Sequence, residues 1–446
     1  LGASGCSTVG KINPFAKKDK ATELAGEGQR ISIIQADEVL APAEALKGVD
    51  FALPTVETVA AWPLPGGTPE QYVGNVSAGK DLTVVWRKSF GQGSKRGRYV
   101  TAPPVAADGK VFLMDADARV VAVDARTGAQ LWRTSTNPGD NKRDRLAFGG
   151  GVAYVDGKLY VSSGFREVLQ LDARTGKVGW RAKTGEAIHG APTVSGGRVF
   201  AVALDNTLMS FDATNGTPSW TYQALVEPAR ILAASSPAVS GDTLVAAFGS
   251  GELVALRANN GNDLWTEALS RASRTSALSE IRDIPGRPVI YNGDVFAVSH
   301  SGVFAATDLR TGQARWTLPV VGITAPLPAG DVVYAVAKDG QVICASRESG
   351  QIYWMRNLNE GFTSKRKGGV FGIGGKKPVR PIWSGPLLSN DRLLIVGQGG
   401  EMVALNAKTG EIAKRIALKG VSTMEPIAMG DTVYVVTQDA DLIAIR

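Results

Sequence analysis

The sequence predicts an all-β protein: an eight-bladed β-propeller of four-stranded blades with tryptophan docking motifs, preceded by an extended N-terminal tether. The first observation is a turn motif ending in glycine that recurs seven times, as in "DARTGAQLW" and "DARTGKVGW". The second is a tryptophan four residues after each of the first six of these glycines. The third is the alternation of apolar residues between Gly, Asp and Asn turns, which is typical of β-strands. About four short strands in each 40 to 50 residues indicate a propeller blade.

The first unit shows how a blade is read. "PPVAADGKVFLMDADARVVAVDARTGAQLW" gives a short strand, a turn at Asp108-Gly109, two further strands, and an outer strand that carries the tryptophan. The eighth unit, "PIAMGDTVYVVTQDADLIAIR", stops before its outer strand. "DLTVVWRKSF" (81–90) has the character of that missing strand, and pairing it into the eighth blade would close the ring and protect both edges. We therefore place the propeller at residues 79–446, with 79–90 closing the last blade.

The tryptophans on the outer strands are expected to pack against the neighbouring blade. Such a side chain buries a large apolar surface and keeps one N–H for a hydrogen bond. Glycine supplies the positive φ that the preceding hairpin requires. The predicted docking residues are Trp86, Trp132, Trp180, Trp220, Trp265, Trp316 and Trp354, whereas the seventh unit has Lys414 at this position.

The N-terminal residues predict a lipid anchor and a tether. "LGASGCS" places small residues directly before Cys6, as in a bacterial lipoprotein signal, so we expect residues 1–5 to be a signal-peptide remnant and Cys6 to be acylated. Residues 6–78 are charged or proline-rich and are expected to form a lipidated, partly disordered tether. A flexible chain of some 70 residues would average about 45 Å end to end.

The residues that catalysis requires are scarce. His189 and His300 are the only histidines and fall in different repeats, and Cys344 is expected to be a small buried hydrophobe. The glycine-rich stretches "FGQGSKRGR" and "GVFGIGGKK" do not complete the Gly-x-x-x-x-Gly-Lys-Ser/Thr pattern of a phosphate-binding loop. No run of about 18 apolar residues occurs, so no membrane-spanning helix is predicted. We therefore predict no catalytic, cofactor-binding or metal-binding residues. The net charge of +7 is mild for 446 residues, and the basic segments lack the interleaved aromatics expected for nucleic-acid binding.

Three connections exceed the usual length: 134–150, 266–287 and 357–385. Long loops on a rigid ring are where binding surfaces are expected. The third is basic and is a candidate for contact with lipid headgroups or an acidic partner. Its candidate residues are Lys365, Arg366, Lys367, Lys376 and Lys377.

The tryptophan-bearing repeat resembles that of the quinoprotein propellers, of which two families form eight-bladed rings. One comprises dehydrogenases that bind pyrroloquinoline quinone and calcium in the central channel, often beneath a Cys-Cys disulfide. No Cys-Cys pair occurs here, and this family remains the alternative from another class. The other is the BamB family, the lipoprotein subunit of the outer-membrane β-barrel assembly machinery. This chain resembles the BamB family in its repeats, in the stretch "AWPLPGGTPE", in its lipoprotein signal and in lacking cofactor ligands.

This second resemblance implies a non-enzymatic, cofactor-free scaffold, lipid-anchored at the periplasmic face of the outer membrane. It would be a monomeric subunit of a hetero-complex, binding the POTRA domains of BamA and other subunits. In the family, two neighbouring inter-blade loops contact BamA, and the matching places here are "EPARILAASSP" and "SEIRDIPGRP". The arginine of the first loop falls early, and Pro285 replaces the second aspartate of the other. The implied contact residues are Arg230, Ile231, Leu232, Glu280, Arg282 and Asp283. A propeller scaffold for a different envelope complex is a third alternative.

Overall fold

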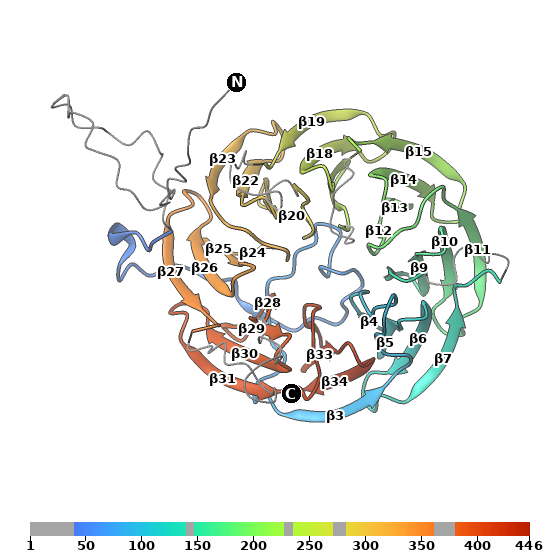
Figure 1. Cartoon of the computed structure of the whole chain (residues 1–446), viewed down its shortest axis with the longest axis horizontal. Helices are drawn as coiled ribbons and strands as arrows, with labels where there is room; N and C mark the ends of the chain where they lie inside the picture. Colours follow the sequence, from blue (N-terminus) through green and yellow to red (C-terminus); the bar gives the residue numbers. More distant parts are fainter. Residues whose placement is uncertain (1–39, 140–146, 227–234, 271–281, 361–379) are drawn as a thin grey trace, which may run out of the picture. The chain divides into compact units, whose positions relative to one another are not determined.

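The structure is a computed structural model that describes residues 40–139, 147–226, 235–270, 282–360 and 380–446. Residues 40–446 form one compact unit. Within the described residues, the strands form eight sheets arranged around a ring, each sheet being one blade (Figure 1). The all-β, eight-bladed fold that the repeats predict is confirmed.

Each blade contains four antiparallel strands, and blade 7 carries two additional short ones. Blades 1 and 2 consist of β4 (Val105–Ala107), β5 (Lys110–Met114), β6 (Arg119–Asp124), β7 (Gln130–Ser135), β8 (Gly150–Val155), β9 (Lys158–Ser163), β10 (Glu167–Asp172) and β11 (Val178–Lys183). Blades 3 and 4 consist of β12 (Thr193–Ser195), β13 (Arg198–Val202), β14 (Thr207–Asp212), β15 (Pro218–Gln223), β16 (Ala238–Ser240), β17 (Thr243–Ala247), β18 (Glu252–Arg257) and β19 (Asp263–Ala268).

Blades 5 and 6 consist of β20 (Val289–Tyr291), β21 (Asp294–Val298), β22 (Phe304–Asp308), β23 (Ala314–Leu318), β24 (Leu327–Ala329), β25 (Val332–Val336), β26 (Gln341–Ser346) and β27 (Ile352–Asn357). Blade 7 consists of β28 (Trp383–Ser389), β29 (Arg392–Gly397), β30 (Glu401–Asn406) and β31 (Ile412–Ala417), extended by β1 (Val56–Glu57) and β2 (Asn75–Val76). Blade 8 consists of β32 (Ile427–Met429), β33 (Thr432–Val436), β34 (Asp441–Ile445) and β3 (Val84–Ser89).

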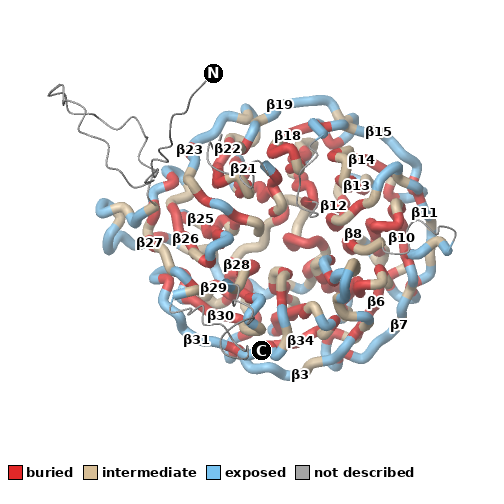
Figure 2. The backbone as a smooth tube through the Cα atoms, viewed as in Figure 1, coloured by how far each residue is buried: buried red, intermediate tan, exposed pale blue. Residues whose placement is uncertain are grey.

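Burial follows the position of a strand within its blade. The two middle strands are almost wholly buried, as in β5 and β6, whereas the outer strands β7, β15 and β19 alternate between exposed and half-buried residues. Figure 2 shows this as an exposed rim around a buried interior. The apolar clusters join side chains of adjacent blades, so the core lies between the blades rather than at the ring axis.

The repeated turn before each outer strand is held by its aspartate. The Asp124 carboxylate accepts hydrogen bonds from the amide and the hydroxyl of Thr127, both at 2.8 Å. Gly128 follows with φ of +70°, and the pairing of β6 with β7 shifts register between Ala122 and Val123. A glycine in the left-handed region beside such a bulge lets the hairpin turn tightly.

The docking tryptophans join successive blades. Six of them donate their indole N–H to a backbone carbonyl in the next blade, at 2.8 to 3.2 Å. The pairs are Trp132–Ala173, Trp180–Ala213, Trp220–Ala258, Trp265–Leu309, Trp316–Arg347 and Trp354–Ala407. Each ring also lies over the turn glycine of that next blade, and Trp86 lies over Gly128 in the same way.

The last blade combines strands from opposite ends of the sequence. β3 pairs antiparallel with β34, from Val84 opposite Ile445 to Ser89 opposite Asp441. Thr83 and Arg446 exchange two backbone hydrogen bonds, at 2.6 and 2.9 Å, beyond the end of this pairing. The ring is therefore closed by a non-local sheet (Figure 1).

The compact unit begins at residue 40, earlier than the boundary at 79 that the sequence predicts. Residues 40–78 are packed against the ring: Phe51, Trp62 and Leu64 are buried, and the segment contains the 3-10 helix η1 (Glu44–Leu46). The predicted tether therefore extends too far, because residues 40–78 are held by contacts with residues far away in the sequence. A proline-rich segment has no local sequence pattern that indicates such contacts.

This N-terminal segment crosses the ring and contacts every blade (Figure 1). Backbone hydrogen bonds join Pro63 to Tyr154, Pro69 to Val239 and Glu70 to Ile290, at 2.7 to 2.9 Å. The remaining blades are reached through the pairs Trp62–Ala106, Gln71–Thr193, Ala52–Asp331, Val76–Ser389 and Val59–Gly430. Among the residues that the structure describes, no helix has the length and hydropathy that crossing a bilayer requires.

Candidate partner-binding site

Two long connections converge at one turn of blade 4. The first joins β15 to β16 and the second joins β19 to β20. The amide of Leu225, in the first, donates a hydrogen bond to a Glu252 carboxylate oxygen at 2.9 Å. Arg282, in the second, lies against the adjacent Gly251, where an added Cβ would fall 2.9 Å from the Cβ of Arg282. Described residues of both loops therefore meet at the turn between β17 and β18.

The surface at this meeting point is apolar with charges beside it. Leu225 is 66% and Val226 is 69% exposed, the highest values among the large hydrophobic side chains of the described residues. Arg282 is also exposed. The Ser250 hydroxyl donates to the same Glu252 oxygen at 2.7 Å, which fixes that carboxylate beneath Leu225. Exposed apolar side chains beside fixed charges are the composition expected of a protein-binding patch.

The residues predicted to contact a partner divide into two groups. Arg230, Ile231, Leu232 and Glu280 lie outside the described residues. Arg282 faces solvent, but Asp283 is only 2% exposed and its carbonyl accepts the amide of His300 at 2.8 Å. Asp283 therefore belongs to the interior of blade 5 in this structure and does not offer its carboxylate at the surface. Sequence reasoning missed Leu225 and Val226, although an apolar pair at the end of an outer strand is a usable signal.

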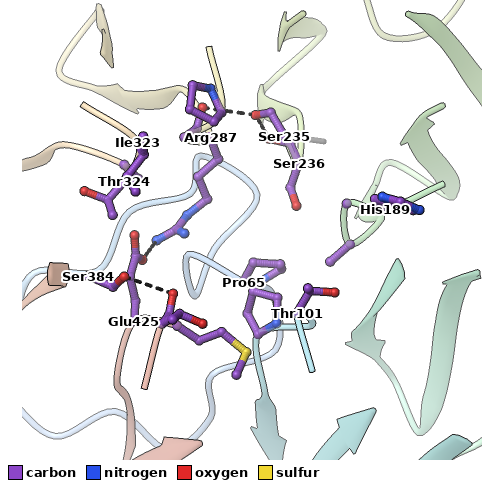
Figure 3. A pocket seen from close by; sticks show the side chains of 18 residues that line it. Pro65, Thr101, His189, Ser235, Ser236, Arg287, Ile323, Thr324, Ser384 and Glu425 are labelled. Carbon is purple, nitrogen blue, oxygen red and sulfur yellow. Dashed lines mark hydrogen bonds and ion pairs between the residues drawn. The ribbon is translucent and has the colours of Figure 1, made fainter. Parts of the chain in front are cut away.

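A cavity of about 220 Å³ lies on the ring axis. It is lined by residues that lead into the first strands of most blades, including Ser235 and Thr324, and by Ser384 near the start of β28 (Figure 3). Arg287 from blade 5 reaches across it and forms a hydrogen-bonded ion pair with Glu425 from blade 8 (Figure 3). Pro65 of the N-terminal segment also lines it, so this segment forms part of its wall.

The two histidines have separate surroundings. His189 lines the axial cavity, and its ring packs on Phe148 with 4.7 Å between centroids. His300 places its Nε2 atom 2.8 Å from the Lys338 Nζ atom and does not line this cavity. Cys344 is buried in blade 6, and burial raises the pKa of its thiol far above the ordinary value. The structure brings none of these residues together.

The cavity does not fit the calcium and quinone site that the dehydrogenase resemblance implies. Among the described residues that line it, Glu425 is the only acidic one, and its carboxylate is already paired with Arg287. Across the described ranges, no group of three or more His, Cys, Asp or Glu side chains is arranged to hold a metal ion. Calcium requires six to eight oxygen ligands, several of them usually carboxylates. We therefore derive no redox step through this cavity.

The remaining predicted sites lie outside the described residues. These are the acylation site Cys6 and the basic-loop residues Lys365, Arg366, Lys367, Lys376 and Lys377.

The fold and the loop surface define a class of protein: a propeller built of quinoprotein-type repeats whose candidate site is a protein-binding surface. The family model described as "Outer membrane protein assembly factor BamB" matches residues 116–356 and 367–446. A model for the β-propeller domain of glucose, ethanol and alcohol dehydrogenases matches only residues 74–156. The chain belongs to the BamB family of outer membrane protein assembly factors.

Individual relatives agree with this assignment. The BamB of Burkholderia pseudomallei is 26% identical over 82% of this chain and 88% of its own, and that of Escherichia coli K12 is 24% identical over 81% and 88%. Among solved structures, BamB from Moraxella catarrhalis superposes with a TM-score of 0.66 at 18% identity, covering 81% of this chain and 99% of that one. Quinohemoprotein alcohol dehydrogenase from Comamonas testosteroni gives 0.64 at 16% identity, covering 84% and 76%. At these identities the structural matches establish the fold alone.

Proposed function

We propose that this protein is a non-enzymatic scaffold lipoprotein of the outer-membrane β-barrel assembly complex, which binds the periplasmic POTRA domains of BamA and assists insertion of β-barrel proteins. The observation that carries the proposal is the convergence of the two long loops at the β17–β18 turn. Family membership supports the assembly role, and the exposed Leu225 and Val226 beside Arg282 support the loops as the docking surface. Asp283 is dropped from this surface because it is buried.

The docking surface is tested by changing side chains that the fold does not need. A triple variant, Leu225→Asp, Val226→Asp and Arg282→Glu, should weaken co-purification of BamA at least tenfold, because it places unpaired like charges where apolar contact is lost. Its melting temperature should stay within a few degrees of the unmodified protein, since all three side chains are exposed.

Leu131→Asp is the matched control, because Leu131 is 49% exposed on the outer strand β7, in blade 1. This variant should retain BamA. Undiminished BamA recovery with the triple variant would place the docking surface elsewhere. Recovery of a different envelope protein, with no BamA, would reject the assembly-complex proposal in favour of another scaffold role.

The proposed location is the periplasmic face of the outer membrane, with Cys6 carrying the lipid. Support comes from the small residues before Cys6 and from the family. Expressed with its full signal sequence, a Cys6→Ala variant should be recovered folded in the soluble periplasmic fraction instead of with membranes. Persistence in the outer-membrane fraction after a high-salt wash would show that lipid at Cys6 is not what holds the protein there.

A further inference from the structure

We propose that the axial cavity receives a short, uncharged stretch of polypeptide contributed by the protein that docks on the two loops. This inference rests on the proposed function, because it takes the docked protein as the source of the segment. It assigns a ligand class to a cavity that the loop surface by itself does not explain.

The channel of the ring already holds polypeptide. Residues 62–71 of this chain form consecutive turns there, and their carbonyls accept hydrogen bonds from the blades: Tyr154 N–H donates to Pro63 O, Val239 N–H to Pro69 O, and Ile290 N–H to Glu70 O. The Gln71 side-chain amide adds bonds to the Thr193 hydroxyl and the Pro237 carbonyl, at 3.1 and 2.9 Å. The inner strands therefore already donate backbone hydrogen bonds to polypeptide inside the channel. The cavity continues this channel beyond Pro65.

The charges of the cavity favour a neutral ligand. Arg287 and Glu425 neutralise each other, so a bound anion would face Glu425 and a bound cation would face Arg287. Two buried polar atoms of the lining, Arg287 Nε and Thr324 Oγ1, have no hydrogen-bond partner in the structure. An uncharged carbonyl oxygen would satisfy the Arg287 N–H without introducing a charge. Such a bond matters because a buried donor left unpaired is destabilising.

The size and walls of the cavity suit a few residues of chain. About 220 Å³ corresponds to roughly seven water molecules at about 30 Å³ each. Prolines from three segments line it: Pro65, Pro103 and Pro285. A row of aromatic rings leads outward from His189 through Phe148 to Tyr99, with centroid separations of 4.7 and 5.4 Å, and Tyr99 is 46% exposed. Hydroxyl groups such as those of Ser235 and Thr101 lie between these apolar rings, so the lining offers both apolar contact and hydrogen bonds to a peptide.

The cavity adjoins the proposed docking loops. Ser235 and Ser236 line it and directly follow residues 227–234 of the first loop. Pro285, Gly286 and Arg287 line it from the end of the second loop. A protein seated on both loops therefore lies beside the cavity, and a projecting segment of that protein can reach it without a second docking event.

The test fills the cavity while leaving the loops intact. Thr101 is exposed at the cavity lining, so Thr101→Trp should occupy the space with little effect on folding. We expect a tenfold or greater rise in the Kd for the BamA periplasmic region. Thr214→Trp, at an exposed turn on the circumference, is the matched control and should leave the Kd unchanged. Thr324→Val, which removes one unpartnered hydroxyl at nearly constant volume, should weaken binding about threefold.

A photo-crosslinker makes the chemistry of the segment visible. With p-benzoylphenylalanine at position 101, the crosslink should fall in an uncharged stretch of the partner. Binding that is normal in both Thr101→Trp and Thr324→Val, or a crosslink into a lysine-rich or acidic stretch, would overturn the inference while leaving the docking proposal intact. If the unmodified protein does not bind the BamA periplasmic region, the proposed function itself fails, and the inference fails with it.

Discussion

At the scale of single residues, the repeated turn forms the contact between successive blades. The aspartate fixes the turn, the glycine permits its φ, and the absence of a Cβ leaves room for the tryptophan of the preceding blade. Hydrogen bonds from the hydroxyl and amide of Thr127 hold the pKa of Asp124 below its ordinary value. The hydroxyl of Thr175 does the same for Asp172. These carboxylates are therefore charged acceptors at neutral pH.

The glycine has two roles that one pair of substitutions separates. Gly261 has φ of +77°, and an added Cβ would lie 2.7 Å from the Trp220 ring. Gly241 has φ of +57° with nothing within 4 Å of an added Cβ. Gly241→Ala should cost about 1–2 kcal/mol from backbone strain alone. Gly261→Ala should cost about 1–3 kcal/mol more, because the Trp220 contact becomes overpacked.

Urea unfolding of the two variants and the unmodified protein gives both free-energy changes. Similar losses in Gly261→Ala and Gly241→Ala would mean that the close approach of Trp220 adds nothing to the requirement for glycine.

At the scale of elements, the interface between blades 7 and 8 differs from the other interfaces because it has no docking tryptophan. β31 carries Lys414 where the seven other outer strands carry the docking tryptophan. In blade 8, β34 and β3 come from distant parts of the sequence, so no hairpin joins them. Blade 8 therefore has no turn glycine against which a tryptophan of blade 7 could pack. Lys414 instead donates to the Asp81 carbonyl at 2.7 Å. The substitution follows from how the ring closes.

At the scale of the whole molecule, the ring is held by closure at its rim and by the segment that crosses its centre. Neither contact is local, so each organises the blades without belonging to one repeat. β3 removes the exposed edge that β34 would otherwise present. Residues 51–78 add bonds to all eight blades, which constrain the blades relative to one another.

Chains beginning at residues 40, 79 and 91 separate these contributions. The chain from 40 should melt within a few degrees of the full protein, because the compact unit is complete. The chain from 79 should melt at a lower temperature but remain monomeric, since β3 is retained. The chain from 91 should aggregate, because β34 becomes an open edge. Thermal melts with light scattering measure this, and equal behaviour of the last two chains would show that β3 is dispensable for closure.

The sequence by itself determined the blades. The evidence for them is local: strand alternation, turn glycines, and the spacing of Trp132, Trp180 and their equivalents. Local patterns can be recognised in a sequence before the fold is known. The same reasoning also found "DLTVVWRKSF" as a strand without a partner and identified the two loops as candidate contacts by resemblance.

Only the tertiary structure decided what depends on distant residues. It placed residues 40–78 in the ring because their hydrogen-bond partners lie in every blade, and it buried Asp283 although the residue sits in a loop. It revealed the exposed Leu225 and Val226, and it brought Arg287 and Glu425 together across the axis from positions 138 residues apart. Exposure and long-range pairing are properties of the packed chain, so no window of sequence contains them.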